Sequence, residues 1–166
     1  EEVENGNFSE IGSEEVTNGD FATDTDWTKG TGWTIANGKA TSSGSNFGGQ
    51  LKQTILSTNK IYLLTFDIVD YTSGKLSLES SYYGTTQLFE GTGSYSAYFT
   101  SLSQTELRLY SQDLIGSIDN VSCKEVGQDW IFIGGWSMGD GVATATSGSG
   151  TAGKLTQTNT LNGINA

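Results

Sequence analysis

An internal repeat constrains this chain more than any other feature of its sequence. Two tryptophans and a glycine recur at an offset of 103 positions (130 − 27): Trp27, Trp33 and Gly38 match Trp130, Trp136 and Gly141. The offset becomes 104 in a later segment (155 − 51), where Leu51 and Gln53 match Leu155 and Gln157. Shared Gly, Ser and Thr bias could repeat the glycine but not both tryptophans in phase. We therefore infer a duplicated structural unit.

The repeat divides the chain into one complete unit and two partial ones. Glu2-Val3 resembles Glu125-Val126, which closes the complete unit. We therefore expect residues 1–12 to be the tail of a preceding unit plus a linker. The complete unit is expected over 13–126, and a partial second unit over 127–166.

The second unit lacks an opening motif that the complete unit has. Asn-Gly-Asp-Phe at 18–21 follows Val16, and Asn-Gly-Asn-Phe at 5–8 follows Val3, but nothing similar follows Val126. Residues 127–166 carry only the front strands of a unit, which cannot close a sandwich alone. We expect them to pack on the complete unit or to pair with the sheet edge of another chain.

Period-two alternation predicts strands rather than helices. Residues 61–71 alternate, with Leu64, Phe66 and Ile68 inward, and the segments 75–79 and 106–110 alternate in the same way. Residues 118–126 predict a strand with a bulge, because Ile118 and Val121 have opposite parity. The one candidate helix, 102–106, is short and not favoured.

Turn chemistry supports the same reading. Asn37-Gly38 lies between two alternating runs and predicts a tight hairpin over 33–41. The chain has 23 glycines and no proline, so its turns must use Gly, Asn, Asp and Ser. Many short strands with such turns favour an all-β sandwich or barrel.

Composition excludes several classes of function. The net charge is −11 with only 8 Lys and Arg, so no basic surface for nucleic acid or anionic membrane is expected. No apolar run approaches the length of a membrane-spanning helix. Cys123 is the single cysteine and there is no histidine, which excludes an internal disulfide and a Cys/His zinc site. We expect Cys123 to be a buried apolar residue in a strand.

Catalysis is also not expected. Without histidine there is no Ser-His-Asp triad, and neither a GxSxG motif nor a phosphate-binding glycine loop is present. Glycoside hydrolysis requires two carboxyl groups in an enclosed cleft. Asp67, Glu79 and Glu90 are available, but no spacing singles out a pair. We therefore predict that the chain is not an enzyme.

Several motifs in fixed order carry a family resemblance. They are the NGDF motif at 18–21, the paired tryptophans, LxQ at 51–53, YxxTF at 62–66, a Gly–Tyr turn at 93–95 and GSIDNVSCKEV at 116–126. Together they resemble the β-jelly-roll carbohydrate-binding modules of families 4, 9 and 22, within the galactose-binding-domain-like group. The tandem form resembles modules in tail-fibre and structural proteins of marine phages. The resemblance covers 13–126 well and 127–158 in part.

The resemblance implies a fold, a ligand and a metal. The fold would be a jelly-roll β-sandwich whose first and last strands are neighbours, and glycan would bind on one concave sheet face. A structural calcium ion would lie between the NGDF loop and the closing strand, with Asp119 as a ligand. The family's acidic residue after the loop Phe is Ala22 here, so the carbonyl of Gly19 and the carboxylates of Asp20 or Asp24 would have to compensate. Alternatively, Asp119 is a turn residue that bonds local amides.

The outward strand faces supply candidate sugar-binding side chains. Sugars are bound by flat aromatic faces together with a few polar groups that hydrogen-bond to hydroxyls. The candidates are Asp67, Tyr71, Glu79, Tyr83, Arg108 and Tyr110. The alternative is an ordinary exposed charge ladder of Glu79, Glu106 and Arg108 across strands. For the four tryptophans we favour core positions over a ligand face.

Three hypotheses follow. The first is a non-catalytic glycan-binding module of a virion or a secreted fibre, working beside neighbouring repeat units or copies of itself. The second is a structural spacer or decoration domain of a virion without ligand. The third is an accessory module of a polysaccharide-degrading enzyme.

Overall fold

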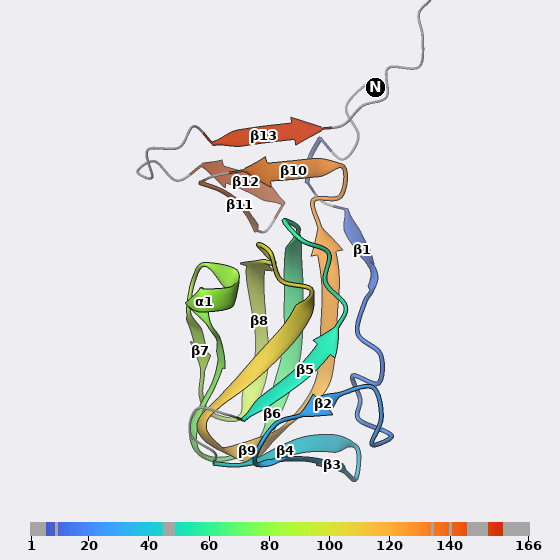
Figure 1. Ribbon diagram of the computed structural model, residues 1–166, viewed down its shortest axis with the longest axis vertical. Coiled ribbons are helices and arrows are strands. Elements are labelled where there is room, and N and C mark those ends of the chain that lie inside the picture. Colours follow the sequence, from blue (N-terminus) through green and yellow to red (C-terminus); the bar gives the residue numbers. More distant parts are fainter. Residues whose placement is uncertain are drawn as a thin grey trace, which may run out of the picture.

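The computed structural model describes residues 6–8, 10–44, 49–133, 135–139, 141–145 and 153–157 (Figure 1). Within them the chain forms thirteen strands and one single-turn helix. In chain order they are β1 (Ile11–Glu14), β2 (Thr28–Lys29), β3 (Trp33–Ala36), β4 (Lys39–Ser43), β5 (Gln50–Thr54), β6 (Ile61–Leu78), α1 (Ser80–Tyr83), β7 (Gln87–Phe89), β8 (Gly93–Thr100), β9 (Glu106–Val126), β10 (Trp130–Ile133), β11 (Trp136–Gly139), β12 (Val142–Ala145) and β13 (Lys154–Gln157).

Two long antiparallel strands, β6 and β9, organise the complete unit. They pair from Ile61↔Val126 at one end to Ser77↔Tyr110 at the other. The far edge of β9 carries β5, β4 and β1 in turn, and the far edge of β6 carries β8 and β7. Figure 1 shows β2 and β5 crossing in front of the β6–β8 pair. This arrangement is the predicted all-β sandwich of jelly-roll type.

Each long strand replaces two strands that alternation predicted separately. The separate strands were expected over 61–71 and 75–79, and over 106–110 and 118–126. The strands continue through the gaps because β6 and β9 remain paired across a bend. At the bend Gly74 has φ +81°, and a β-carbon there would lie 2.0 Å from the carbonyl oxygen of Asp113. Only glycine allows the two backbones to approach this closely.

The predicted bulge lies in β9. Thr65 pairs with Ser122 and Asp67 with Asp119, so β9 has one residue more than β6 in this interval. The extra residue allows both Ile118 and Val121 to be buried despite their opposite parity. The segment 102–106 forms a turn followed by the start of β9, as expected, and the one helix among the described residues is α1.

The core consists of the residues that alternation placed inward. Leu64, Phe66, Ile68, Leu76, Leu78, Leu107 and Leu109 are all buried. Burial of each large apolar side chain contributes about 1.5–3 kcal/mol. Trp27 and Trp33 are also buried, so the core positions expected for them are confirmed. Cys123 is fully buried in β9, as predicted.

The second unit repeats the strand pairings of the first with the same register. The predicted hairpin β3–β4 pairs Trp33 with Ser42, and β11–β12 pairs Trp136 with Ala145 at the same offset. Likewise β2–β5 pairs Lys29 with Leu51, and β10–β13 pairs Phe132 with Leu155. The repeat in sequence is therefore a repeat in structure.

The described part of the second unit packs on one end of the complete unit, which is one of the two predicted arrangements. Ile61 and Val126 of the complete unit form a small core with Phe132 and Met138 of the second. Figure 1 shows β10–β13 lying across this end of the sandwich. Phe8 also joins this core and contacts Trp130, with ring centroids 5.2 Å apart. Residues 158–166 lie outside the described residues.

Candidate functional site

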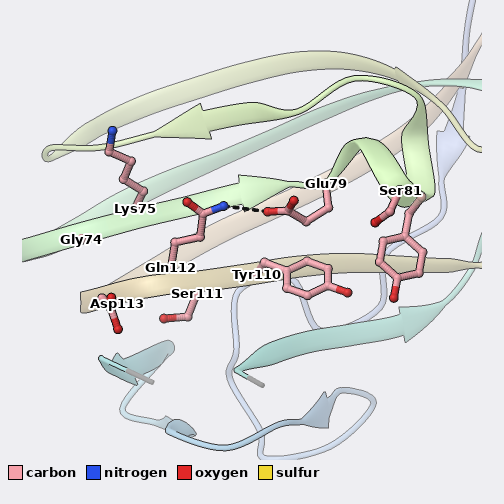
Figure 2. A pocket seen from close by; sticks show the side chains of 9 residues that line it. Gly74, Lys75, Glu79, Ser81, Tyr110, Ser111, Gln112 and Asp113 are labelled. Atoms are coloured by element: carbon pink, nitrogen blue, oxygen red, sulfur yellow. Dashed lines mark hydrogen bonds between the residues drawn. The ribbon is translucent and has the colours of Figure 1, made fainter. Parts of the chain in front are cut away.

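A groove of about 560 Å³ opens where the end of β6, the start of β9 and α1 meet (Figure 2). Its lining combines aromatic, charged and amide side chains. They belong to Gly74, Lys75, Glu79, Ser81, Tyr82, Tyr110, Ser111, Gln112 and Asp113.

The strand period explains how β9 supplies this lining. Leu107, Leu109 and Ser111 are buried, so Tyr110 and Gln112 project from the opposite face of the strand. Ser77 pairs with Tyr110 next to the end of β6 at Leu78, and Glu79 follows that end directly. Figure 2 shows Glu79 and Gln112 pointing toward one another across this edge.

The single turn of α1 places Tyr82 at the groove and Tyr83 inside. Gly84 has φ 79° and its amide donates to the carbonyl of Ser80 at 2.8 Å, which ends the helix in a left-handed cap. Consecutive residues of a helix point about 100° apart, so Ser81 and Tyr82 line the groove while Tyr83 packs in the core.

Two stacked tyrosines form the aromatic part of the groove. The rings of Tyr82 and Tyr110 lie 5.7 Å apart at 28°. The guanidinium carbon of Arg108 lies 4.3 Å from the centre of the Tyr82 ring, a cation–π contact. Arg108 is held in place by Glu106, with Nη2 donating to Oε2 at 2.5 Å. Burial, together with a hydrogen bond to Tyr82, raises the pKa of Tyr110 to about 12, so its phenol is protonated at neutral pH.

The Glu79 carboxylate, held by two hydrogen bonds, forms the polar part of the groove. Oε1 of Glu79 accepts hydrogen bonds from Gln112 Nε2 at 2.7 Å and from Ser77 Oγ at 2.6 Å. Lys75 lines the same groove and forms an ion pair with Glu90 at 3.3 Å. The aromatic faces can contact the C–H surface of a ring, and the polar groups can hydrogen-bond to its hydroxyls.

The structure brings some predicted site residues together and separates others. Glu79 and Tyr110 line the groove, and Arg108 lies beside it against Tyr82. Tyr83 is 3 % exposed and does not line this groove. Its hydroxyl donates to the carbonyl of Glu106 and accepts from the amide of Arg108. Tyr71 donates its hydroxyl to the carbonyl of Gly74 at 3.1 Å and does not line the groove.

Asp67 belongs to a different cleft of about 440 Å³ between β6, β8 and β9. Its Oδ2 accepts from Asn120 Nδ2 at 2.8 Å. Hydrogen bonds from Ser94 and Asn120 lower the pKa of Asp67 below its usual value.

Tyr82 and Gln112 were not among the predicted binding residues, and neither were the other lining residues Gly74, Lys75, Ser81, Ser111 and Asp113. Gln112 continues the outward face of Arg108 and Tyr110 by two residues, so the alternation contained the signal, but the predicted strand ended at Tyr110. For Tyr82 the signal was Gly84, which is typical of a helix end. A helical turn over 80–83 directs Tyr82 and Tyr83 to different sides.

The carboxylates predicted to bind calcium contact other groups of the chain. The NGDF loop does meet the closing strand, since Val121 N donates to Gly19 O at 2.9 Å. However, Asp24 pairs with Lys29, Asp119 Oδ1 accepts from the amide of Asn120 at 2.7 Å, and Asp20 Oδ1 accepts from the amide of Ala22. Among the described residues no three His, Cys, Asp or Glu side chains converge. In this arrangement each of the three carboxylates has a partner within the chain, and calcium binding by these residues stays a prediction.

Comparisons with known proteins add no family. No protein-family model and no curated protein matches the chain, so the family resemblance rests on the sequence motifs. Within the part of the chain that the structure describes, no helix is long and apolar enough to span a bilayer.

Proposed function

We propose that this chain is a non-catalytic carbohydrate-binding module that takes a surface glycan into the groove between α1 and β9. The observation that carries the proposal is the stacked pair Tyr82–Tyr110 next to the hydrogen-bonded pair Glu79–Gln112. A sugar ring has an apolar C–H face and a rim of hydroxyls, and this groove offers a partner to each.

The fixed geometry of the groove supports binding rather than mere surface exposure. Arg108 packs over the Tyr82 ring, and Gln112 and Ser77 hold the Glu79 carboxylate. Side chains that are already ordered lose less conformational freedom when a ligand binds. In this proposal Oε2 of Glu79, which has no hydrogen-bond partner among the described residues, accepts from a sugar hydroxyl.

Single sites of this kind bind sugars with low affinity, and display of several copies together compensates for it. A Kd of about 1 mM corresponds to only about −4.1 kcal/mol. Display of several copies raises apparent affinity by roughly 10²–10⁴. We place the module on a virion or a secreted fibre, as the resemblance to phage tail-fibre modules implies, where copies of the chain or neighbouring units would provide this gain.

The test is a broad glycan array with the intact chain, followed by titration calorimetry on any sugar that binds. Tyr110→Ala and Glu79→Gln are expected to weaken binding by about tenfold or more, because each removes one aromatic or one charged contact. Asp67→Asn, in the other cleft, is the matched control and should bind normally. An affinity for the sugar that is unchanged in both groove variants would refute the proposed site.

A structural spacer is the second candidate. It is favoured by the packing of the second unit on the complete one through Phe132 and Met138, which shows how units can stack. An array that stays silent both with calcium and with a chelator would support the spacer and refute glycan binding.

A further inference from the structure

We propose that the Asn-Gly-Asn-Phe segment at residues 5–8 is the opening loop of the second unit. In this arrangement the complete unit, 13–126, is inserted into a loop of a second unit whose described residues are 6–8, 127–133, 135–139, 141–145 and 153–157. The proposal replaces the expectation that residues 1–12 are the tail of a preceding unit plus a linker. It does not depend on the proposed function.

The phenylalanines of the two opening motifs are equivalent in backbone and in contact. Phe21 has φ 50° and Phe8 has φ 53°, a left-handed conformation that is uncommon for a bulky side chain. Phe21 packs on Trp27 with ring centroids 5.5 Å apart at 45°. Phe8 packs on Trp130 with centroids 5.2 Å apart at 44°. Trp130 is the repeat partner of Trp27, so the same aromatic pair is built twice.

The loop backbones contact the same turn in each unit. A β-carbon on Gly38, in the β3–β4 turn, would lie 3.8 Å from the carbonyl oxygen of Asp20. A β-carbon on Gly141, in the β11–β12 turn, would lie 3.7 Å from the carbonyl oxygen of Asn7. Asp20 and Asn7 occupy the third position of their motifs, and Gly38 and Gly141 are repeat partners. Two independent contacts therefore place residues 7–8 where the second unit lacks its own opening.

Chain connectivity accommodates the insertion. Phe21 and Trp27 are six positions apart (27 − 21), whereas Phe8 and Trp130 are 122 apart (130 − 8). The intervening unit begins and ends at one place, because Ile11 in β1 pairs with Val126 at the end of β9. A domain whose ends are adjacent can occupy a loop of another domain without stretching it.

The experiment compares Phe8→Ala with the unaltered chain by amide hydrogen exchange. We expect exchange in β10–β13 to accelerate by about tenfold or more, because the Phe8–Trp130 pair is lost, while β6 and β9 remain protected. Ile11→Ala, three residues later at a side chain that is 55 % exposed, is the control and should leave β10–β13 unchanged. Phe8→Tyr retains the ring and should restore protection.

Two results would overturn the proposal. Unchanged exchange in β10–β13 after Phe8→Ala would mean that the second unit folds without the segment. Equal acceleration in β6, β9 and β10–β13 would mean that Phe8 belongs to the core of the complete unit rather than to the second.

Discussion

Replacement of Gly74 by alanine tests whether the bend shared by β6 and β9 requires glycine. Gly74 has φ +81°, and its new β-carbon would lie 2.0 Å from the carbonyl oxygen of Asp113, 2.2 Å from its carbonyl carbon and 2.5 Å from Leu114 N. These atoms are backbone atoms of β9 and cannot rotate away. Either strand must shift, and Gly74 also lines the groove.

The expected loss of stability combines two costs and one smaller gain. A left-handed alanine costs about 1–2 kcal/mol. Relief of the overlap by backbone movement costs about 1–3 kcal/mol, as for other overpacked sites. Reduced freedom of the unfolded chain returns about 0.4–1 kcal/mol. The free energy of unfolding should therefore fall by about 1–5 kcal/mol, which leaves a domain of typical stability folded at 25 °C.

Urea unfolding measured by tryptophan fluorescence provides the assay. With a slope of about 2 kcal/mol per molar urea, the midpoint should fall by about 0.5–2.5 M. Gly91→Ala is the matched control: Gly91 has φ +89°, but its nearest neighbour is the flexible Tyr95 hydroxyl at 3.6 Å. It should shift the midpoint by about 0.8 M or less, because the backbone cost and the offset from the unfolded chain apply without the overlap. Equal shifts in the two variants would refute the role assigned to the close approach.

Three further predictions concern the thiol, acid stability and calcium. Burial raises the pKa of Cys123, so a thiol-specific reagent at pH 8 should label the native chain about 100-fold more slowly than the urea-unfolded chain; rapid native labelling would contradict this. Hydrogen bonds from Ser94 and Asn120 lower the pKa of Asp67, so their stabilisation is present above the unfolded pKa of about 3.9 and is lost as the pH falls through the lower folded value. Urea titrations between pH 6 and pH 3 should therefore show that the free energy of unfolding falls less for Asp67→Asn than for the unaltered chain. Equal falls would show that Asp67 does not contribute to the acid sensitivity. Calcium chloride or a chelator should leave the Tm unchanged, because Asp24 and Asp119 are engaged by Lys29 and by a backbone amide; a rise in Tm with calcium would show that the NGDF loop rearranges to bind the ion.

Sequence reasoning worked best where the interaction is local. Asn37-Gly38 fixes its hairpin through two left-handed residues, and the structure shows φ 54° and 71° there. Alternation identified the inward leucines because one face of each strand is buried. The repeat was visible because the tryptophans keep their spacing, and Trp27 and Trp130 each pack on a phenylalanine.

The continuity of β6 and β9 could not be predicted in this way. Between 69 and 75 the strand leaves the core and is largely exposed, so its polar pattern is typical of a loop. Pairing with Asp113 and its neighbours, a contact across more than thirty residues, keeps the segment extended. The groove depends on that pairing, which extends β9 beyond Tyr110 and so places Gln112 in the groove. Tyr82 lies on α1, a turn that alternation does not predict.

The pairing of Ile11 with Val126 determines how the complete unit responds to tension. A pull on residues 10 and 127 acts on neighbouring antiparallel strands from the same end. The hydrogen bonds between β1 and β9 are then loaded one after another, in the geometry of a zipper, rather than together as in shear. Under mechanical load β1 should peel from β9 first, from Ile11 toward Glu14, while the β6–β9 ladder is still intact.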